Sequence, residues 1–215
     1  MRFRIDLKIL FFLCLFYFTK QLDLYILVML FAFIHECAHM LSALFLGFKI
    51  EYIELMPFGF FTKLEANIDD YNKKIGKSNM VEFKKIFVIL AGPLSNLMII
   101  AVLLFLNKFY IINKLDIMIY SNLLLFLFNI LPIFPLDGGR LCKSVFKICV
   151  GARKANIAIH EISYVTGIVI TVFSSIMILY LKNIAILLIV MYMWGLIRIE
   201  KKRFNLRSRI HTNQE

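Results

Sequence analysis

Two histidines and a glutamate carry the clearest chemical signal in this sequence. His35, Glu36 and His39 lie in the segment HECAH, with the two histidines four residues apart. On an α-helix this spacing puts both imidazole rings on one face, where they can bind the same zinc ion beside a glutamate that acts as a base. The pattern therefore predicts a hydrolytic zinc site. The alternative is a pair of buried histidines that are satisfied by hydrogen bonds alone.

The helix expected to position these residues is itself unusual. The segment lies inside an apolar stretch, residues 24–46, which is long enough to cross a lipid bilayer. Ionisable side chains within a membrane span are costly unless they are coordinated, paired or hydrated, so they favour a functional site.

The composition as a whole indicates a membrane protein. Hydrophobic residues make up 61% of the chain and the mean hydropathy is +0.81, well above the values of soluble domains. We expect an all-α polytopic membrane protein with one metalloprotease domain over residues 1–198 and a basic cytoplasmic tail over residues 199–215. Its six expected spans are 7–19, 24–46, 86–106, 117–131, 162–181 and 184–197. The first could be read as a signal peptide, but no small-residue cleavage motif follows it.

The charge distribution predicts an orientation in the membrane. With both termini in the cytoplasm, 21 of the 25 Lys and Arg residues fall on the cytoplasmic side, as the positive-inside rule requires. The net charge of +11 is then explained by contact with the lipid bilayer, and no motif supports nucleic-acid binding. In this orientation the HECAH segment lies nearer the cytoplasmic face.

A second segment offers a carboxylate. Residues 129–146, NILPIFPLDGGRLCKSVF, contain Asp137 after Pro132 and Pro135 and before two glycines. The prolines oppose a continuous helix, so we expect an irregular segment that aims Asp137 inward as a third zinc ligand. Taken alone, the same residues are an ordinary turn sequence with Asp as the turn former.

A third segment predicts a β-hairpin after the second span. Residues 48–65, FKIEYIELMPFGFFTKLE, suggest two short membrane-associated strands with a turn from Pro57 to Gly59. An edge strand there could pair with an extended substrate by β-augmentation. An interfacial loop with aromatic anchors is the alternative. Residues 66–85 are expected to form a solvated cytoplasmic loop.

Three motifs together resemble a known family. HECAH, AGPLSN at residues 91–96 and NILPIFPLDGGR at residues 129–140 are similar to the signature regions of site-2 proteases, the intramembrane zinc metalloproteases, and most of all to the stage IV sporulation protein FB group. The resemblance implies that one zinc ion per chain is bound by His35, His39 and Asp137, with Glu36 as the catalytic base. It further implies that substrate lies near Asn129, and we add Pro135 and Asn96 as substrate-binding candidates.

Other interpretations of these last residues stay open. Asn129 could cap the fourth span, and Asn96 could brace the metal site or serve with Gly92 and Pro93 in helix packing.

The same resemblance implies a reaction and its setting. We expect cleavage of a membrane-tethered protein near the cytoplasmic side, releasing a sporulation sigma factor from its pro-form. The enzyme would then lie in the mother-cell membrane around the forespore, under the control of inhibitory membrane proteins. Members of this group often continue into a nucleotide-sensing CBS domain, for which few residues remain here after the last span.

Two other functions are weighed. One is a transporter of zinc or another divalent metal, although no internal repeat is visible. The other is an inactive relative that acts as a scaffold, against which the intact Glu36 argues.

The remaining candidates are weaker. The four cysteines, at positions 14, 37, 142 and 149, have no paired spacing, so no disulfide framework is expected. His160 and Glu161 are adjacent but have no further ligand nearby in the sequence, which favours a polar interface.

Overall fold

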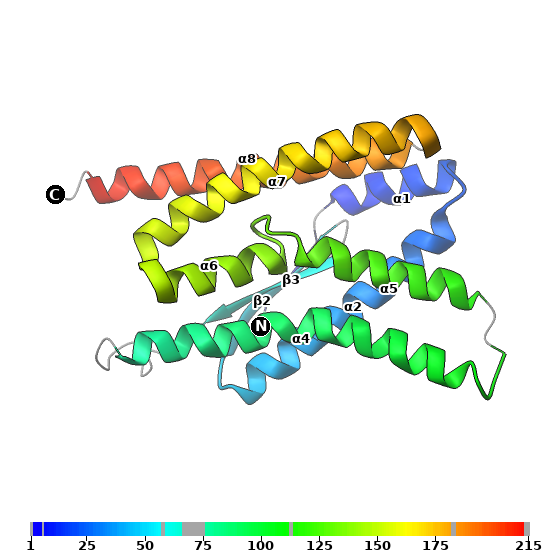
Figure 1. Cartoon of the computed structure of the whole chain (residues 1–215), viewed down its shortest axis with the longest axis horizontal. Helices are drawn as coiled ribbons and strands as arrows, with labels where there is room; N and C mark the ends of the chain where they lie inside the picture. The colour runs from blue at the N-terminus through cyan, green and yellow to red at the C-terminus, as the bar shows by residue number, and fades with distance from the viewer. Residues whose placement is uncertain are drawn as a thin grey trace. The chain divides into compact units, whose positions relative to one another are not determined.

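The computed structural model describes residues 2–5, 7–56, 59–65, 76–111, 114–181 and 184–212. The chain is predominantly helical (Figure 1) and divides into two compact units, Met1–Asn129 and Ile130–Glu215.

The first unit contains a small sheet and the helix that carries the HECAH segment. Its elements are, in chain order, β1 (Arg2–Ile5), α1 (Lys8–Phe18), α2 (Leu22–Phe45), β2 (Lys49–Met56), β3 (Gly59–Glu65), α4 (Gly76–Leu106) and α5 (Leu115–Ile130, whose last residue begins the second unit). The sheet has the order β1-β2-β3, with β1 parallel and β3 antiparallel to β2.

The strands β2 and β3 pair where the sequence predicts a hairpin. Their register joins Lys49 to Glu65 and Met56 to Gly59, and the predicted turn residue Pro57 lies outside the described residues. The strand β1 was not predicted, because four residues next to an apolar stretch carry too little pattern to identify a strand that depends on a distant partner. The described residues are thus predominantly helical, as predicted, and β1 is the strand of the small sheet that the sequence did not indicate.

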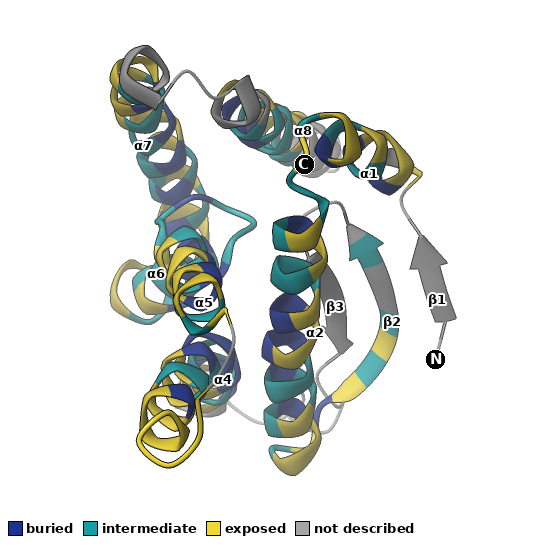
Figure 2. Cartoon of the chain, turned by 90° about the vertical axis from the view of Figure 1, so that its right-hand side faces the viewer, coloured by how far each residue is buried: buried dark blue, intermediate teal, exposed yellow. Residues whose placement is uncertain are grey.

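The core of the first unit forms around α2, which packs against α4. Phe31 and Ala32 of α2 are buried with Leu125 of α5, and Ala43 is buried with Val88 of α4. Figure 2 shows that the buried positions of α2 follow one side of the helix, and His35 and His39 belong to this buried set. The apolar side chains on the other side are left for lipid.

A glycine ends α2 and turns the chain into the sheet. Gly47 has a φ of +82°, a left-handed conformation that favours glycine. The N–H of Phe48 donates to the carbonyl of Ala43 at 2.9 Å, and the N–H of Gly47 donates to the carbonyl of Leu44 at 3.1 Å. These bonds satisfy carbonyls that have no partner within the helix, so β2 begins directly beside the end of α2.

The second unit consists of helices. These are α6 (Asp137–Val150), α7 (Ala152–Leu181) and α8 (Ile184–Thr212), and α7 packs against both of the others. Gly151, with a φ of +83°, separates α6 from α7. The N–H of residue 134 donates to the Ser163 hydroxyl of α7 at 3.0 Å, so this hydrogen bond fixes the loop that precedes α6 against α7.

Three helices in the described part of the chain are long and apolar enough to cross a membrane: Leu22–Phe45, Asn79–Leu106 and Ala152–Met177. Two shorter apolar helices, Ile9–Phe18 and Leu115–Ile130, accompany them. The chain is therefore a membrane protein, and its six crossings remain a prediction.

Several helices run further than the predicted spans. α4 begins at Gly76, so residues 76–85 are helical where a loop was expected. α7 begins at Ala152, and α8 continues to Thr212 through most of the expected tail. The reason is that hydropathy detects only the apolar part of a helix, whereas the helix itself extends through polar residues that have no reason to break it.

Candidate metal centre

The two histidines of HECAH converge on one point. His35 and His39 are 4% and 5% exposed, and their Nε2 atoms lie 3.1 Å apart. Two nitrogen ligands of one tetrahedral zinc, each about 2.05 Å from the metal, are about 3.3 Å apart. The pair thus has the separation that a shared zinc ion requires, and the i, i+4 spacing on α2 produces it.

A backbone carbonyl of α4 orients the His39 ring. The Nδ1 atom of His39 lies 2.7 Å from the carbonyl oxygen of Val88. Since a carbonyl only accepts hydrogen bonds, Nδ1 carries the proton and the Nε2 lone pair is available to a metal. The sequence contains no signal for this contact, because the acceptor is a main-chain atom whose position depends on how α4 packs against α2.

A side-chain amide of α4 orients the His35 ring. The Nδ2 atom of Asn96 lies 3.0 Å from Nδ1 of His35, and Asn96 is fully buried. Its Oδ1 atom has no hydrogen-bond partner among the described residues. Asn96, predicted to lie near substrate, is thus placed against the ring of a zinc-ligand candidate.

A glycine makes room beside both rings. A Cβ atom on Gly92 would overlap Nε2 of His39 and Nε2 of His35. Any larger residue would therefore fill the space in front of the two ligand atoms. With the matched Nε2 separation, this space shows that the residues present fit a zinc ion. The sequence marked Gly92 only as a packing residue.

The glutamate of HECAH is buried close by on the same helix. Glu36 is 5% exposed, and no other described residue is hydrogen-bonded to its carboxylate. A carboxylate is a proton acceptor by its chemistry, and this one is buried on the same helix as the two histidines.

Asp137 takes a different local structure from the one expected. It is the first residue of α6 rather than part of an irregular segment. The helix can start there because the two glycines that follow pack on the preceding backbone: a Cβ on Gly138 would overlap the carbonyl oxygen of Ile130. The carboxylate is buried and lies 3.5 Å from Nη1 of Arg140, and the helix N-terminus favours its negative charge.

The remaining candidates lie on either side of the loop before α6. Asn129 is near the C-terminal end of α5, and Pro135 follows Phe134 through a cis peptide bond in the loop. Both are half-buried. The ring of His160 lies 4.7 Å from that of Phe204, and the four cysteines are free thiols.

Comparison with known proteins agrees with the motifs. The model of Peptidase family M50 matches residues 24–112 and 107–174. A zinc metalloprotease of Methanocaldococcus jannaschii is 28% identical over 80% of this chain and 47% of its own length. The stage IV sporulation protein FB of Bacillus subtilis is 27% identical over 64% of this chain and 45% of its own length. The chain thus spans about half the length of the curated relatives that it matches.

A solved structure supports the same assignment. The site-2 protease from Methanocaldococcus jannaschii superposes with a TM-score of 0.69 at 25% identity, covering 92% of this chain and 89% of that one. The family match includes α2 with its HECAH segment and extends through α4, α5 and α6 into α7. The chain therefore belongs to Peptidase family M50.

Proposed function

We propose that this chain is an intramembrane zinc endopeptidase that cleaves a membrane-tethered protein. The observation that carries the proposal is the pair of buried Nε2 atoms, 3.1 Å apart, on a helix long enough to span a membrane. Membership of Peptidase family M50 and the zinc metalloprotease among its relatives support it. His35, His39 and Asp137 are the proposed ligands of one zinc ion per chain, within a metalloprotease domain over residues 1–198.

The residues of this chain divide the chemistry between them. Zinc bound here supplies a Lewis acid for hydrolysis of a peptide bond. Glu36 takes a proton from the attacking water and returns it to the nitrogen of the leaving amine, so that acid and base chemistry use one carboxylate. Its burial next to His35 keeps that carboxylate within the helix face that holds the ligands.

An edge strand is proposed to present the substrate. A scissile bond inside a helix is hydrogen-bonded and shielded, so substrate must be extended before it can be cleaved. β3 is one of the two edge strands of the sheet and lies against α2. An extended substrate paired with β3 would therefore run beside the helix that carries Glu36. Asn129, Pro135 and Asn96 stay as candidates for substrate contact.

The similarity to the sporulation relative supports a substrate class. The similarity to stage IV sporulation protein FB supports a pro-sigma factor tethered to the membrane as the substrate, and inhibitory membrane proteins as partners. We propose cleavage near the cytoplasmic side, both termini in the cytoplasm, and a location in the mother-cell membrane around the forespore. The excess of basic residues in the proposed cytoplasmic segments supports this orientation.

Three variants test the proposal directly. A tethered pro-sigma factor is co-expressed with the wild type, Glu36→Gln and Asp137→Ala, and the released fragment and bound zinc are both measured. Glu36→Gln should retain zinc and lose cleavage, because it removes the base and leaves the ligands. Asp137→Ala should lose both. The matched control is Glu82→Gln, which changes another buried glutamate, paired with Lys85 at 2.9 Å, and should cleave normally.

The outcomes separate protease from transporter. Equal cleavage by all four proteins would overturn the proposal. Zinc uptake by vesicles that contain the Glu36→Gln variant, with no cleavage by the wild type, would favour transport.

A further inference from the structure

A cavity lies between α7 and α8, outside the metal centre. Its volume is about 470 Å³, and its lining comprises Tyr164 of α7 and Trp194, Ile197, Arg198 and Lys201 of α8. The four residues of α8 are spaced i, i+3, i+4 and i+7, which puts them on one face of the helix. The cavity is large enough for a small ligand or for part of a larger one.

The aromatic side chains that line the cavity are held by contacts between α7 and α8. The indole N–H of Trp194 donates to the hydroxyl of Thr171 at 2.8 Å, and its ring meets that of Tyr164 edge to face with centroids 5.5 Å apart. Gly167 lets α8 approach closely, since a Cβ there would lie 3.0 Å from Cδ1 of Ile197. The aromatic part of the cavity lining is thus held in place by the packing of α7 against α8.

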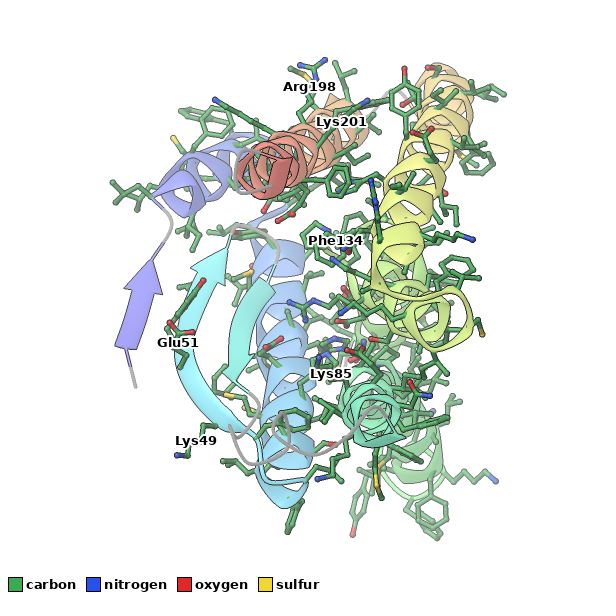
Figure 3. The ribbon with its side chains drawn as sticks, turned by 90° about the vertical axis from the view of Figure 1, so that its left-hand side faces the viewer. Lys49, Glu51, Lys85, Phe134, Arg198 and Lys201 are labelled. Atoms are coloured by element: carbon green, nitrogen blue, oxygen red, sulfur yellow. The ribbon has the colours of Figure 1, made fainter. Side chains whose placement is uncertain are left out.

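Two cationic side chains lie at one end of this aromatic lining. The Nζ atom of Lys201 lies 5.5 Å from the centre of the Tyr164 ring, and Arg198 is exposed one turn earlier on α8. Figure 3 shows both on α8, with Lys201 extending towards α7. In the described part of the chain, neither cation has a carboxylate within ion-pair distance. Their charge is therefore available to an anionic ligand.

The position of the cavity along α8 indicates which anion it would receive. Residues 184–197 of α8 are apolar, and basic residues follow at once from Arg198. If residues 184–197 cross the membrane as predicted, Trp194 lies where the chain passes from the hydrocarbon region to the headgroups, the level at which tryptophan and tyrosine gather. A lipid phosphate lies at that depth, and its glycerol and acyl chains lie on the apolar side. The cavity has the same order of groups, because its two cations lie next to its aromatic side chains.

We propose that this cavity binds the headgroup of an anionic phospholipid. Arg198 and Lys201 would bind the phosphate, while Trp194, Tyr164 and Ile197 would contact the glycerol and the first part of the acyl chains. The inference depends only on residues of the second unit, and it stands or falls independently of the proposed protease activity.

Trp194 is the one tryptophan in the chain and supplies the assay. The detergent-solubilised full chain is titrated with phosphatidylglycerol or phosphatidylcholine whose acyl chains are brominated near the glycerol, and quenching of tryptophan fluorescence is followed. We expect phosphatidylglycerol to quench at lower concentration. Each cation is worth about fivefold in affinity at a membrane surface, so Arg198→Gln with Lys201→Gln should weaken this binding on the order of 25-fold.

A matched control removes equal charge elsewhere. Arg153→Gln with Lys154→Gln, at exposed positions of α7 away from the cavity lining, should leave the titration unchanged. Equal quenching by both lipids, or equal loss in the control variant, would overturn the proposal. Displacement of the brominated lipid by millimolar inorganic phosphate would assign the site to a soluble anion, and displacement by an acidic peptide alone would assign it to a protein. Either result also overturns it.

Discussion

The hydrogen bond between Asn96 and His35 predicts how zinc affinity depends on a residue that is not itself a zinc ligand. In the structure, Nδ1 of His39 donates to Val88, so the contact between the two Nε2 atoms is a donation from His35 to His39. His35 Nδ1 then accepts from the Asn96 amide. Zinc needs the opposite tautomer of His35, with the proton on Nδ1, and Asn96 must then offer its oxygen.

The size of the effect follows from burial. In Asn96→Ala, zinc binding would leave the Nδ1–H group of His35 buried without an acceptor, which costs about 1–3 kcal/mol. This corresponds to a loss of zinc affinity of about 5- to 150-fold, in the range of about 10- to 100-fold typical for groups that orient metal ligands. Asn96→Asp should bind zinc nearly as tightly as the wild type, because a carboxylate accepts the same hydrogen bond.

The assay is competition for zinc between the purified protein and a fluorescent chelator. Asn122→Ala is the matched control, since Asn122 is also fully buried with an unpaired Oδ1 but donates to the carbonyl of Met118 on its own helix. Zinc affinity unchanged in Asn96→Ala, or reduced equally in Asn122→Ala, would refute the reasoning. A raised KM with unchanged zinc affinity would show that Asn96 contacts substrate, as the sequence predicts.

Three further predictions test other parts of the structure. Gly92→Ala should abolish zinc binding, because its Cβ fills the space before the ligand atoms, whereas Gly195→Ala, with nothing within 4 Å, should bind zinc normally in the same chelator assay. Ser163→Ala removes the acceptor for the N–H of residue 134 and should lower the free energy of unfolding by about 1–3 kcal/mol, measured by denaturant titration. Burial raises the pKa of the Cys142 thiol despite an opposing backbone hydrogen bond, so less thiolate is present at a given pH. In a variant that keeps only Cys142, iodoacetamide labelling should therefore rise at higher pH than labelling of the free thiol N-acetylcysteine, and equal profiles would contradict this.

The local sequence pattern was sufficient to predict that the two histidines share one helix face. The i, i+4 spacing of His35 and His39 depends only on helix geometry, and the apolar stretch around them made that helix predictable. The start of α6 at Asp137 was missed, because Pro132 and Pro135 suggested irregular backbone throughout. The prolines do end the preceding helix, but Gly138 and Gly139 allow a new one to begin against it. Such a restart depends on backbone packing that residue propensities do not describe.

By itself, the sequence determined the membrane class, the HECAH helix and the family, since each rests on composition or on spacing within short segments. Only the tertiary structure decided what surrounds the two imidazoles: the carbonyl of Val88, the amide of Asn96 and the open space at Gly92. It also brought Trp194 of α8 to Tyr164 of α7. These contacts join residues far apart in the chain, and their geometry depends on how whole helices pack. The spacing of the two histidines follows from one helix, α2. The groups that surround them and set the affinity for zinc depend on how two helices, α2 and α4, pack together.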